Sequence, residues 1–356
     1  MAQASGTPAS EDRPAAVPVK TMAMRRVRRV LRFCLWSLLA VVGLGAALVG
    51  YSVYSYTSAP EVPQLSGTLT KGTIEVDGLT RTYRTYVPQG LAKGAPLVVV
   101  MHGSGENGAQ IRIETGYGFD RTADRHGFAV VYPDANEGDW ETCSIVGRLS
   151  TKGLAVDDVG FLTRLVDRLI GDIGVDPVRV FAAGSSRGGS MAIRLALEAP
   201  SRFRAVAAVS ASVPTPENSR CKPVGRSASI MIMNGTKDPL VPFDGGEVSL
   251  FGLFYKNGKV RSSRESGQYF AALNHIAGAP ATNETNVADG VRVEQVLWRN
   301  DLKVDVELVA IHGGGHGIPQ PYRRRPRLLG PLLLGPSPKE PNGPDMIWAF
   351  FDRQRQ

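Results

Sequence analysis

Two serines stand between glycines in the segment FAAGSSRGGS, residues 181–190, directly after an apolar run. Residues 184–188 fit the pattern G-x-S-x-G with Ser186 at the centre, whereas Ser185 lies off-centre. In this pattern the serine occupies a sharp strand-to-helix turn that only small neighbours allow, with its oxygen exposed at the top of a sheet. Ser186 is therefore the candidate nucleophile, and an ordinary glycine-rich turn is the alternative.

A serine hydroxyl needs a neighbouring base to take its proton and an acid to orient that base. With this serine pattern the chain order is serine, then aspartate or glutamate, then histidine. Three histidines follow Ser186: His275, His312 and His316. The segment GQYFAALNHIAG carries an apolar stripe at helical spacing, and His275 lies opposite it. We expect His275 to be a solvated surface residue.

His312 and His316 both belong to VDVELVAIHGGGHGIP, in which a strand runs into a glycine-rich loop. A catalytic histidine needs a loop beyond the strand end, from which its ring can reach the serine, and His316 meets this requirement better. We expect packing or a backbone hydrogen bond to hold His312. Their i, i+4 spacing resembles helical metal ligands, but three glycines between them disfavour a helix, and we expect no metal site.

The candidate acid follows the apolar run SIMIMNG. Asp238 stands just past this expected strand and before a proline that stops any helix, although a turn-forming Asp-Pro would look the same. Asp244, which lies deeper in the loop, is the second candidate. We expect the Asp238 carboxylate to orient His316.

Backbone amides must stabilise the oxyanion of the tetrahedral intermediate. One is expected from Arg187, the residue after the nucleophile, and the other from Ser104, in the turn HGSGENG after PLVVVM. A flexible loop is the alternative for this turn. Trp140 follows another strand and either borders the site or packs in the core.

The surrounding pattern predicts the elements that position these residues. Continuous apolar runs of strand length are typical of strands buried on both faces. They are PLVVVMHG, FAVVYPD, VRVFAAGSS, FRAVAAVS and SIMIMNG. The clearest helix begins at Asp157 and Asp158, which can cap it, and ends at Gly174. Residues 73–88 predict a hairpin around Asp77-Gly78. Strands alternating with helices indicate a mostly parallel sheet with helices on both faces and function at the carboxyl ends of the strands.

Residues 33–51 form an uncharged run of 19 residues, long enough to cross a membrane as a helix. Arginines precede the run, so the positive-inside rule predicts a cytoplasmic N-terminus. The expected organisation is a cytoplasmic basic tail at 1–32, a transmembrane anchor at 33–56, a linker at 57–66 and a catalytic domain at 67–356. A cleaved signal peptide, followed by secretion, is the alternative.

The distribution of charge limits the kinds of partner that are expected, and the cysteines bear on the cellular compartment. The formal net charge is +8, but residues 1–32 and 323–327 hold this whole excess, so a basic nucleic-acid-binding surface is not expected. Cys143 and Cys221 are the two cysteines on the outer side of the expected membrane helix. A disulfide persists in that compartment, and two buried free thiols are the alternative.

With these residues in place, the chain resembles the exported polyhydroxybutyrate depolymerase and feruloyl esterase group of α/β-hydrolase serine esterases. Seven segments between about residues 70 and 320 carry the resemblance. They are PLVVVMHGSGENG, FAVVYPDANEGDW, DDVGFLTRLVD, VRVFAAGSSRGGSMA, FRAVAAVSAS, NGTKDPLVPFDGG and GGGHGIP. The resemblance implies an α/β-hydrolase fold, here preceded by the transmembrane helix. It assigns Ser186 as nucleophile, Asp238 as acid and His316 as base.

The sequence departs from this group at three places. Many members have a cysteine at the position of Ser104, although the expected donor there is a backbone amide. Gly317-Ile318-Pro319 stands where members often have Thr-Trp-Pro. Residues 320–339 look like an insertion, which either covers the site or lies against a membrane with its arginines toward lipid headgroups.

The expected function is that of a membrane-anchored serine esterase at the cytoplasmic membrane, with its catalytic domain outside the cytoplasm. It would hydrolyse esters of hydroxyalkanoate oligomers, or acyl and feruloyl esters of polysaccharide, through an acyl-enzyme and without cofactor or metal. A serine peptidase on the same fold is one alternative, and a catalytically silent binding protein is another. The order of serine, aspartate and histidine along the chain favours the enzyme.

Overall fold

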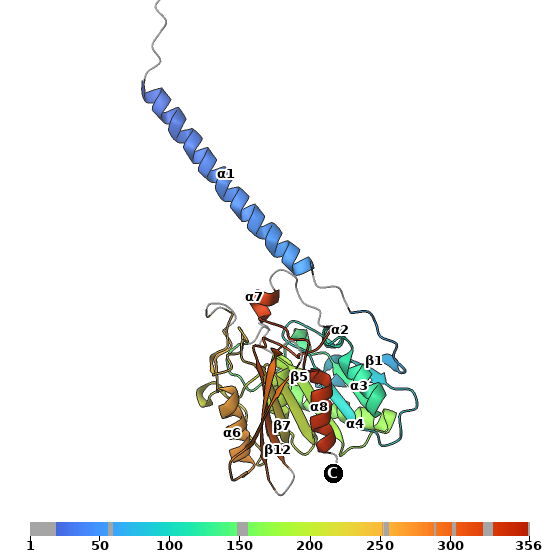
Figure 1. The fold of residues 1–356 in the computed structure, drawn as a ribbon. Coiled ribbons are helices and arrows are strands. Elements are labelled where there is room, and N and C mark those ends of the chain that lie inside the picture. The colour runs from blue at the N-terminus through green and yellow to red at the C-terminus, as the bar shows by residue number, and fades with distance from the viewer. Residues whose placement is uncertain are drawn as a thin grey trace, which may run out of the picture. The chain divides into compact units, whose positions relative to one another are not determined.

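A ten-stranded sheet is the centre of the chain after residue 54 (Figure 1). The computed structural model describes residues 19–55, 60–147, 156–250, 252, 256–287, 290–300, 304–322 and 330–354. The strands lie side by side in the order β1-β2-β4-β3-β5-β6-β7-β12-β11-β10. Their bounds are β1 Thr68–Val76, β2 Leu79–Val87, β3 Leu97–Met101, β4 Ala129–Pro133, β5 Val180–Ser185, β6 Ala205–Val209, β7 Ser229–Gly235, β10 Ala281–Asn286, β11 Arg292–Arg299 and β12 Asp305–His312.

The middle of this sheet is parallel and its two edges are antiparallel. Strands β4, β3, β5, β6, β7 and β12 pair in parallel, whereas β1 and β2 at one edge and β11 and β10 at the other pair antiparallel with their neighbours. Every residue of β3, β4, β6 and β7 is buried, as expected of strands covered on both faces. The mostly parallel sheet of the α/β-hydrolase fold is confirmed.

Helices cover both faces of the sheet. Their bounds are α2 Gly108–Glu114, α3 Gly118–His126, α4 Asp158–Ile173, α5 Arg187–Glu198, α6 Ser263–Leu273, α7 Gly330–Leu334 and α8 Gly343–Arg353. Side chains of α4, α5 and α6 share one hydrophobic core with alternate strand residues, and side chains of α2, α3 and α8 share a second core with the others. Short elements complete the fold: the 3-10 turns Asn136–Gly138 and Pro216–Asn218, and the ribbon β8 Gly246–Glu247 with β9 Lys259–Val260.

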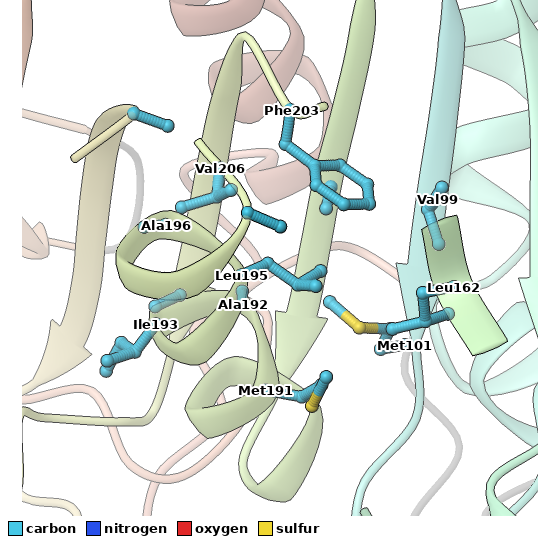
Figure 2. Close-up of a cluster of buried hydrophobic side chains, with 14 of the residues drawn as sticks. Val99, Met101, Leu162, Met191, Ala192, Ile193, Leu195, Ala196, Phe203 and Val206 are labelled. Carbon is cyan, nitrogen blue, oxygen red and sulfur yellow. The ribbon is translucent and has the colours of Figure 1, made fainter. Parts of the chain in front are cut away.

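The helix after Ser186 is held by its apolar face. Figure 2 shows Met191, Leu195 and Ala196 of α5 among a cluster that includes Met101 of β3 and Leu162 of α4. All five side chains are fully buried. Burying a side chain of leucine or methionine size contributes about 1.5–3 kcal/mol, so this face fixes the helix, and with it the turn that precedes it.

The local signals that predicted the hairpin and the first long helix are confirmed. β1 and β2 pair around Asp77 and Gly78, which both have positive φ. The Asp157 side chain accepts a hydrogen bond from the Gly160 amide at the start of α4, and Gly174 ends the helix in the left-handed conformation. Residues 148–155 lie outside the described part of the chain.

The N-terminal unit contains one described element, the helix α1 Val19–Tyr54. Residues 24–51 have a mean hydropathy of 2.2 over the most apolar window, and no other described helix is long and apolar enough to cross a membrane. The predicted apolar run lies inside α1, but the helix begins well before it and includes the arginines at 25–32. Such a helix fits a membrane anchor and a signal sequence equally well.

Cys143 and Cys221 form a disulfide that links two loops 78 residues apart in the sequence. The two loops also form a backbone hydrogen bond from the Arg220 amide to the Cys143 carbonyl. The described residues contain one further cysteine, Cys34, which is exposed on α1. The structure therefore brings together the two cysteines that the sequence analysis paired.

Replacing Cys143 and Cys221 by serine is expected to lower the free energy of unfolding by about 2–4 kcal/mol, because the link restricts the unfolded chain. The difference is measured by urea unfolding under non-reducing conditions. Adding a reductant should destabilise the parent protein by the same amount and leave the double variant unchanged. An equal reductant effect on both proteins would contradict the expectation.

Candidate active site

Ser186 occupies the sharp turn between β5 and α5. Its backbone has φ 57° and ψ −118°, outside the regions that side-chain-bearing residues normally adopt. Strain of this kind costs of order 1–3 kcal/mol and persists where the surroundings enforce it. Here the Ser186 amide donates to the Val209 carbonyl at 2.8 Å, and its carbonyl accepts from the Ser190 amide at 2.9 Å.

Two glycines make this turn possible. A side chain at Gly184 would lie 2.2 Å from the Gly188 carbonyl oxygen, and one at Gly188 would lie 2.3 Å from the Met101 carbonyl oxygen. Both distances are far inside van der Waals contact, so the turn can close only with glycine at these positions. The small neighbours expected around Ser186 therefore have a direct steric cause.

Asp238 and His316 are paired at the carboxyl end of the sheet. The Nδ1 atom of His316 lies 2.7 Å from Oδ2 of Asp238, and both side chains are almost fully buried. The other carboxylate oxygen accepts from the amides of Leu240 and Val241 at 2.8 and 3.0 Å. The carboxylate is thus fixed by three contacts, and it orients the imidazole.

The loop that carries His316 is held on both sides of the histidine. The His316 amide donates to the Leu334 carbonyl at 2.6 Å, and the Gly315 amide donates to the Pro336 carbonyl at 2.7 Å. On the other side the Gly317 amide donates to Oγ of Ser210 at 2.6 Å. The described part of the segment 320–339 therefore supports the histidine loop.

Ser210 is itself a strained residue. It directly follows β6, it is fully buried, and its φ is 50°. Its amide donates to the Met233 carbonyl of the neighbouring strand at 3.0 Å. Its hydroxyl is therefore fixed at the point where it receives the Gly317 amide, next to His316.

Replacing Ser210 by glycine is expected to lower kcat about tenfold with little change in KM. Glycine adopts the same backbone without strain, so this variant removes the hydroxymethyl group that holds the Gly317 amide, and a slightly misplaced base slows the reaction. Steady-state kinetics of the parent and the variant test this expectation. A rise in KM with an unchanged kcat would show that Ser210 contacts the substrate and does not position the loop.

One pocket is lined by both Ser186 and His316. Its remaining lining residues are Ser144, Arg187, Ser190, Ser210, Ala211, Ser212, Leu240, Val241, Val248, Asn257 and Val260. Val241, Val248 and Val260 form a small hydrophobic cluster of their own, to which Leu240 adds. The pocket lining thus combines an apolar cluster with several polar side chains, among them a serine hydroxyl and an imidazole.

The turn at 102–105 follows β3 and contacts the start of α5. The Gly103 amide donates to Oε2 of Glu106 at 2.8 Å, and the Gly105 amide donates to the Gly138 carbonyl at 2.9 Å. The close approach of Gly188 to the Met101 and His102 carbonyls brings this turn against the N-terminus of α5. Ser104 and the Arg187 backbone therefore lie at adjoining turns.

His102 and Trp140 support that turn from the interior. The Nε2 atom of His102 accepts from the Ala135 amide at 2.9 Å, and Nδ1 lies 2.7 Å from the Gly103 carbonyl, to which a protonated nitrogen donates. The Trp140 indole donates to the His102 carbonyl at 3.0 Å, and its ring is 1% exposed. Trp140 is not among the residues that line the pocket around Ser186. Its contacts instead support the turn.

Burial lowers the pKa of His102 below its usual value of 6.5. The unfolded chain therefore binds a proton below about pH 6.5 that the folded protein does not, so stability is expected to fall as the pH drops below that value, by up to about 1.4 kcal/mol per pH unit. Burial also raises the pKa of Asp120 to about 6. The folded protein therefore keeps a proton on this carboxyl at pH values where the unfolded chain has lost it, so the contribution of Asp120 to stability falls as the pH rises toward 6.

The variant His102→Gln separates the two groups, because it retains Asp120. Its free energy of unfolding, measured by urea titration from pH 7 to pH 5, is expected to fall less steeply on acidification than that of the parent. Parallel slopes for the two proteins would contradict a neutral, buried His102.

The Arg187 side chain is buried in the wall of the pocket. Its Nε atom donates to the Trp140 carbonyl at 3.0 Å and lies 3.0 Å from Oδ1 of Asp139. Its Nη1 atom donates to Oδ1 of Asn257 at 3.1 Å. The sequence analysis considered only the backbone of Arg187, since these partners are distant in sequence.

The other candidates lie apart from the site. His312 ends β12 and contacts Glu294 at 3.2 Å and Arg292 at 3.1 Å, so side chains of β11 hold it, and not the packing or backbone bond that the sequence suggested. His275 is exposed as expected, but α6 ends at Leu273, before it. Asp244 is exposed.

A serine on a strained strand-to-helix turn, with a buried Asp-His pair at the same edge of a mostly parallel sheet, defines a serine hydrolase of the α/β-hydrolase fold. Residues 81–241 match the family model described as esterase PHB depolymerase. The chain belongs to this esterase family, and it is a carboxylic ester hydrolase of the serine hydrolase type.

Two relatives and one solved structure are similar to this chain. The protein named "Putative esterase NocK", from Nocardia uniformis subsp. tsuyamanensis, is 36% identical over 78% of this chain and 83% of its own length. Feruloyl esterase C of Emericella nidulans is 29% identical over 53% of this chain and 66% of its own length. An acetyl xylan esterase structure from Aspergillus awamori is 19% identical, with a TM-score of 0.46 over 74% of this chain and 94% of the other.

Proposed function

We propose that Ser186 is the nucleophile of an esterase that works through an acyl-enzyme. His316 removes the hydroxyl proton as the oxygen attacks the ester carbonyl, and then gives that proton to the leaving alcohol. Asp238 keeps Nδ1 of His316 protonated, so that Nε2 is the basic nitrogen. Water, activated by the same imidazole, then releases the acid. The Asp238–His316 contact of 2.7 Å is the observation that carries this proposal.

The oxyanion is proposed to bind the backbone amides of Ser104 and Arg187. The first lies in the turn after β3, and the second begins α5, where the positive end of a helix dipole adds to the attraction. The packing of Gly188 against the end of β3 supports this assignment, because it brings the two turns together.

The proposed substrates are carboxylic esters of hydroxyalkanoate oligomers, or acyl and feruloyl esters of polysaccharide. The family description and the feruloyl esterase relative support these classes. The enzyme is proposed to act outside the cytoplasm, held by α1 at the cytoplasmic membrane. The disulfide, which persists in oxidising compartments, and the apolar helix support this location.

The full-length chain, purified in detergent, tests the activity with p-nitrophenyl acetate and butyrate, and a fluorogenic peptide tests for peptidase activity. The proposal predicts turnover of the esters with a burst of p-nitrophenol in the first turnover. Cleavage of the peptide alone, or turnover of neither substrate, would overturn it.

A further inference from the structure

Residues 330–336, which we call the support segment, contact both the loop that carries the acid and the loop that carries the base. Gly335 is buried at this contact, with φ 70°. A side chain on Gly335 would lie 2.7 Å from the Lys237 carbonyl oxygen and 3.2 Å from Cδ of Pro239, the residues on either side of the proposed acid. It would also lie 3.1 Å from Cα of Gly315, the residue before the proposed base. Gly335 therefore fills the corner between the two loops.

Two buried amides of the base loop find their acceptors in the support segment. The His316 amide donates to the Leu334 carbonyl at 2.6 Å, and the Gly315 amide donates to the Pro336 carbonyl at 2.7 Å. A side chain on Gly315 would lie 2.2 Å from the Leu334 carbonyl oxygen, so loop and segment meet through backbone atoms. A buried amide without an acceptor is costly, so the backbone at His316 must follow the support segment if the segment moves.

The acid loop and the base loop are also joined directly. The Lys237 amide donates to the Gly314 carbonyl at 2.8 Å, and the Gly313 amide donates to Oγ1 of Thr236 at 2.9 Å. All four residues precede the Asp-His pair in their loops, so the loops could still spread apart beyond these bonds. The contacts of Gly335 lie farther along both loops and limit that movement.

The chain that follows the support segment is anchored to the core. The Gly343 amide at the start of α8 donates to the Pro319 carbonyl at 2.8 Å, and a side chain on Gly343 would lie 2.6 Å from Cγ2 of Ile318. The apolar face of α8 is buried through Ile347, Trp348, Phe350 and Phe351. The support segment is therefore tied, through α8, to the residues that follow His316.

We propose that Gly335 is a positioning residue, which sets the distance between the acid and the base of the esterase. This inference rests on the proposed function, since it takes Asp238 and His316 as the working acid and base. A side chain on Gly335 would push the Lys237 carbonyl, and Asp238 with it, away from His316. No described residue of the support segment lines the pocket around Ser186, so the chemical step should suffer and substrate binding should not.

Gly335→Ala and a matched control, Gly127→Ala, test this role by kinetics. Gly127 ends α3 with φ 69°, so alanine there meets the same backbone strain, but its side chain would have no atom within 4 Å. With the full-length protein in detergent and p-nitrophenyl butyrate, Gly335→Ala is expected to lower kcat at least tenfold and to change KM less than threefold. Gly127→Ala should keep kcat within twofold of the parent. Equal kcat values in the two variants would overturn the proposal.

Proton NMR separates a positioning role from a loss of stability. The hydrogen bond between an imidazole and a carboxylate is short and charge-assisted, and its proton resonates far downfield of the backbone amides. Loss of this resonance in His316→Ala assigns it to Nδ1 of His316. We expect Gly335→Ala to lose or shift the resonance and Gly127→Ala to keep it. An unchanged resonance in Gly335→Ala would overturn the proposal, whatever its kcat.

Gly315→Ala reaches the same contact from the base loop and serves if Gly335→Ala does not fold. The φ of Gly315 lies outside the left-handed region, so alanine adds no backbone strain there and meets only the support segment. The same fall in kcat and the same change in the resonance are expected. A parent-like kcat and resonance in this variant would overturn the proposal.

Failure of the proposed function gives a different result. If the parent hydrolyses no ester, the resonance alone decides, and its loss in Gly335→Ala but not in Gly127→Ala would still support the positioning role. If the parent hydrolyses esters but shows no resonance, the comparison of kcat and KM decides. A parent with neither turnover nor resonance would overturn both proposals.

Discussion

Replacing Ser186 by alanine is expected to lower kcat for p-nitrophenyl butyrate by about 10^5-fold or more, because the variant has no oxygen to form the acyl-enzyme. Alanine keeps the Cβ atom that the backbone at φ 57° already accommodates, so the variant should fold normally. Initial rates with the purified protein measure the loss, and thermal unfolding verifies that the fold is intact.

Ser185→Ala is the matched control for this experiment. Ser185 belongs to β5 and is largely buried next to the nucleophile, but it does not line the pocket. Its replacement is expected to change kcat less than threefold. If Ser185→Ala abolished turnover while Ser186→Ala retained it, the centre of the G-x-S-x-G turn would not be the nucleophile.

Replacing Asp238 by asparagine is expected to lower kcat by about 10^3- to 10^4-fold with a smaller effect on KM. The asparagine amide would favour the tautomer of His316 whose proton is on Nε2, and that nitrogen could no longer accept the proton of Ser186. The contacts from the Leu240 and Val241 amides, which both donate to the same oxygen, would also weaken, since a neutral oxygen accepts less strongly than a carboxylate.

Asp244→Asn provides the comparison for Asp238. Asp244 lies in the same loop, six residues farther along the chain, and is exposed. We expect its replacement to leave kcat within about twofold of the parent, and steady-state kinetics of both variants on one ester measure the difference. Equal losses in the two variants would mean that the loop as a whole, and not the His316 contact, is responsible.

The elements around the site could be predicted because their signals are local. The buried strands are continuous apolar runs, and α4 carries its own capping aspartate and terminal glycine. Likewise, the G-x-S-x-G turn is a short local pattern: Gly184 is required by the Gly188 carbonyl four residues away, although Gly188 itself is required by the Met101 carbonyl of β3. Asp238 and His316 each follow a strand, and the carboxyl ends of parallel strands meet at one edge of a sheet.

Other features depend on contacts between distant parts of the chain. The Arg187 side chain meets Asn257, which is 70 residues away, and no pattern near either residue indicates the contact. The support of His316 by the Leu334 carbonyl uses only backbone atoms, so it leaves no trace in the residue types. The sequence shows Ser210 only as a serine at the end of an apolar run. Its role depends on the Gly317 amide, 107 residues later in the chain.

Labelling with a fluorophosphonate tests the central claim most directly, because this reagent phosphonylates an activated serine and leaves ordinary serines unmodified. The full-length protein is labelled in detergent, digested, and analysed by tandem mass spectrometry to locate the adduct. The account predicts one modified residue, Ser186, and loss of labelling in His316→Ala. An adduct on another serine, or no adduct on a protein that hydrolyses esters, would contradict it.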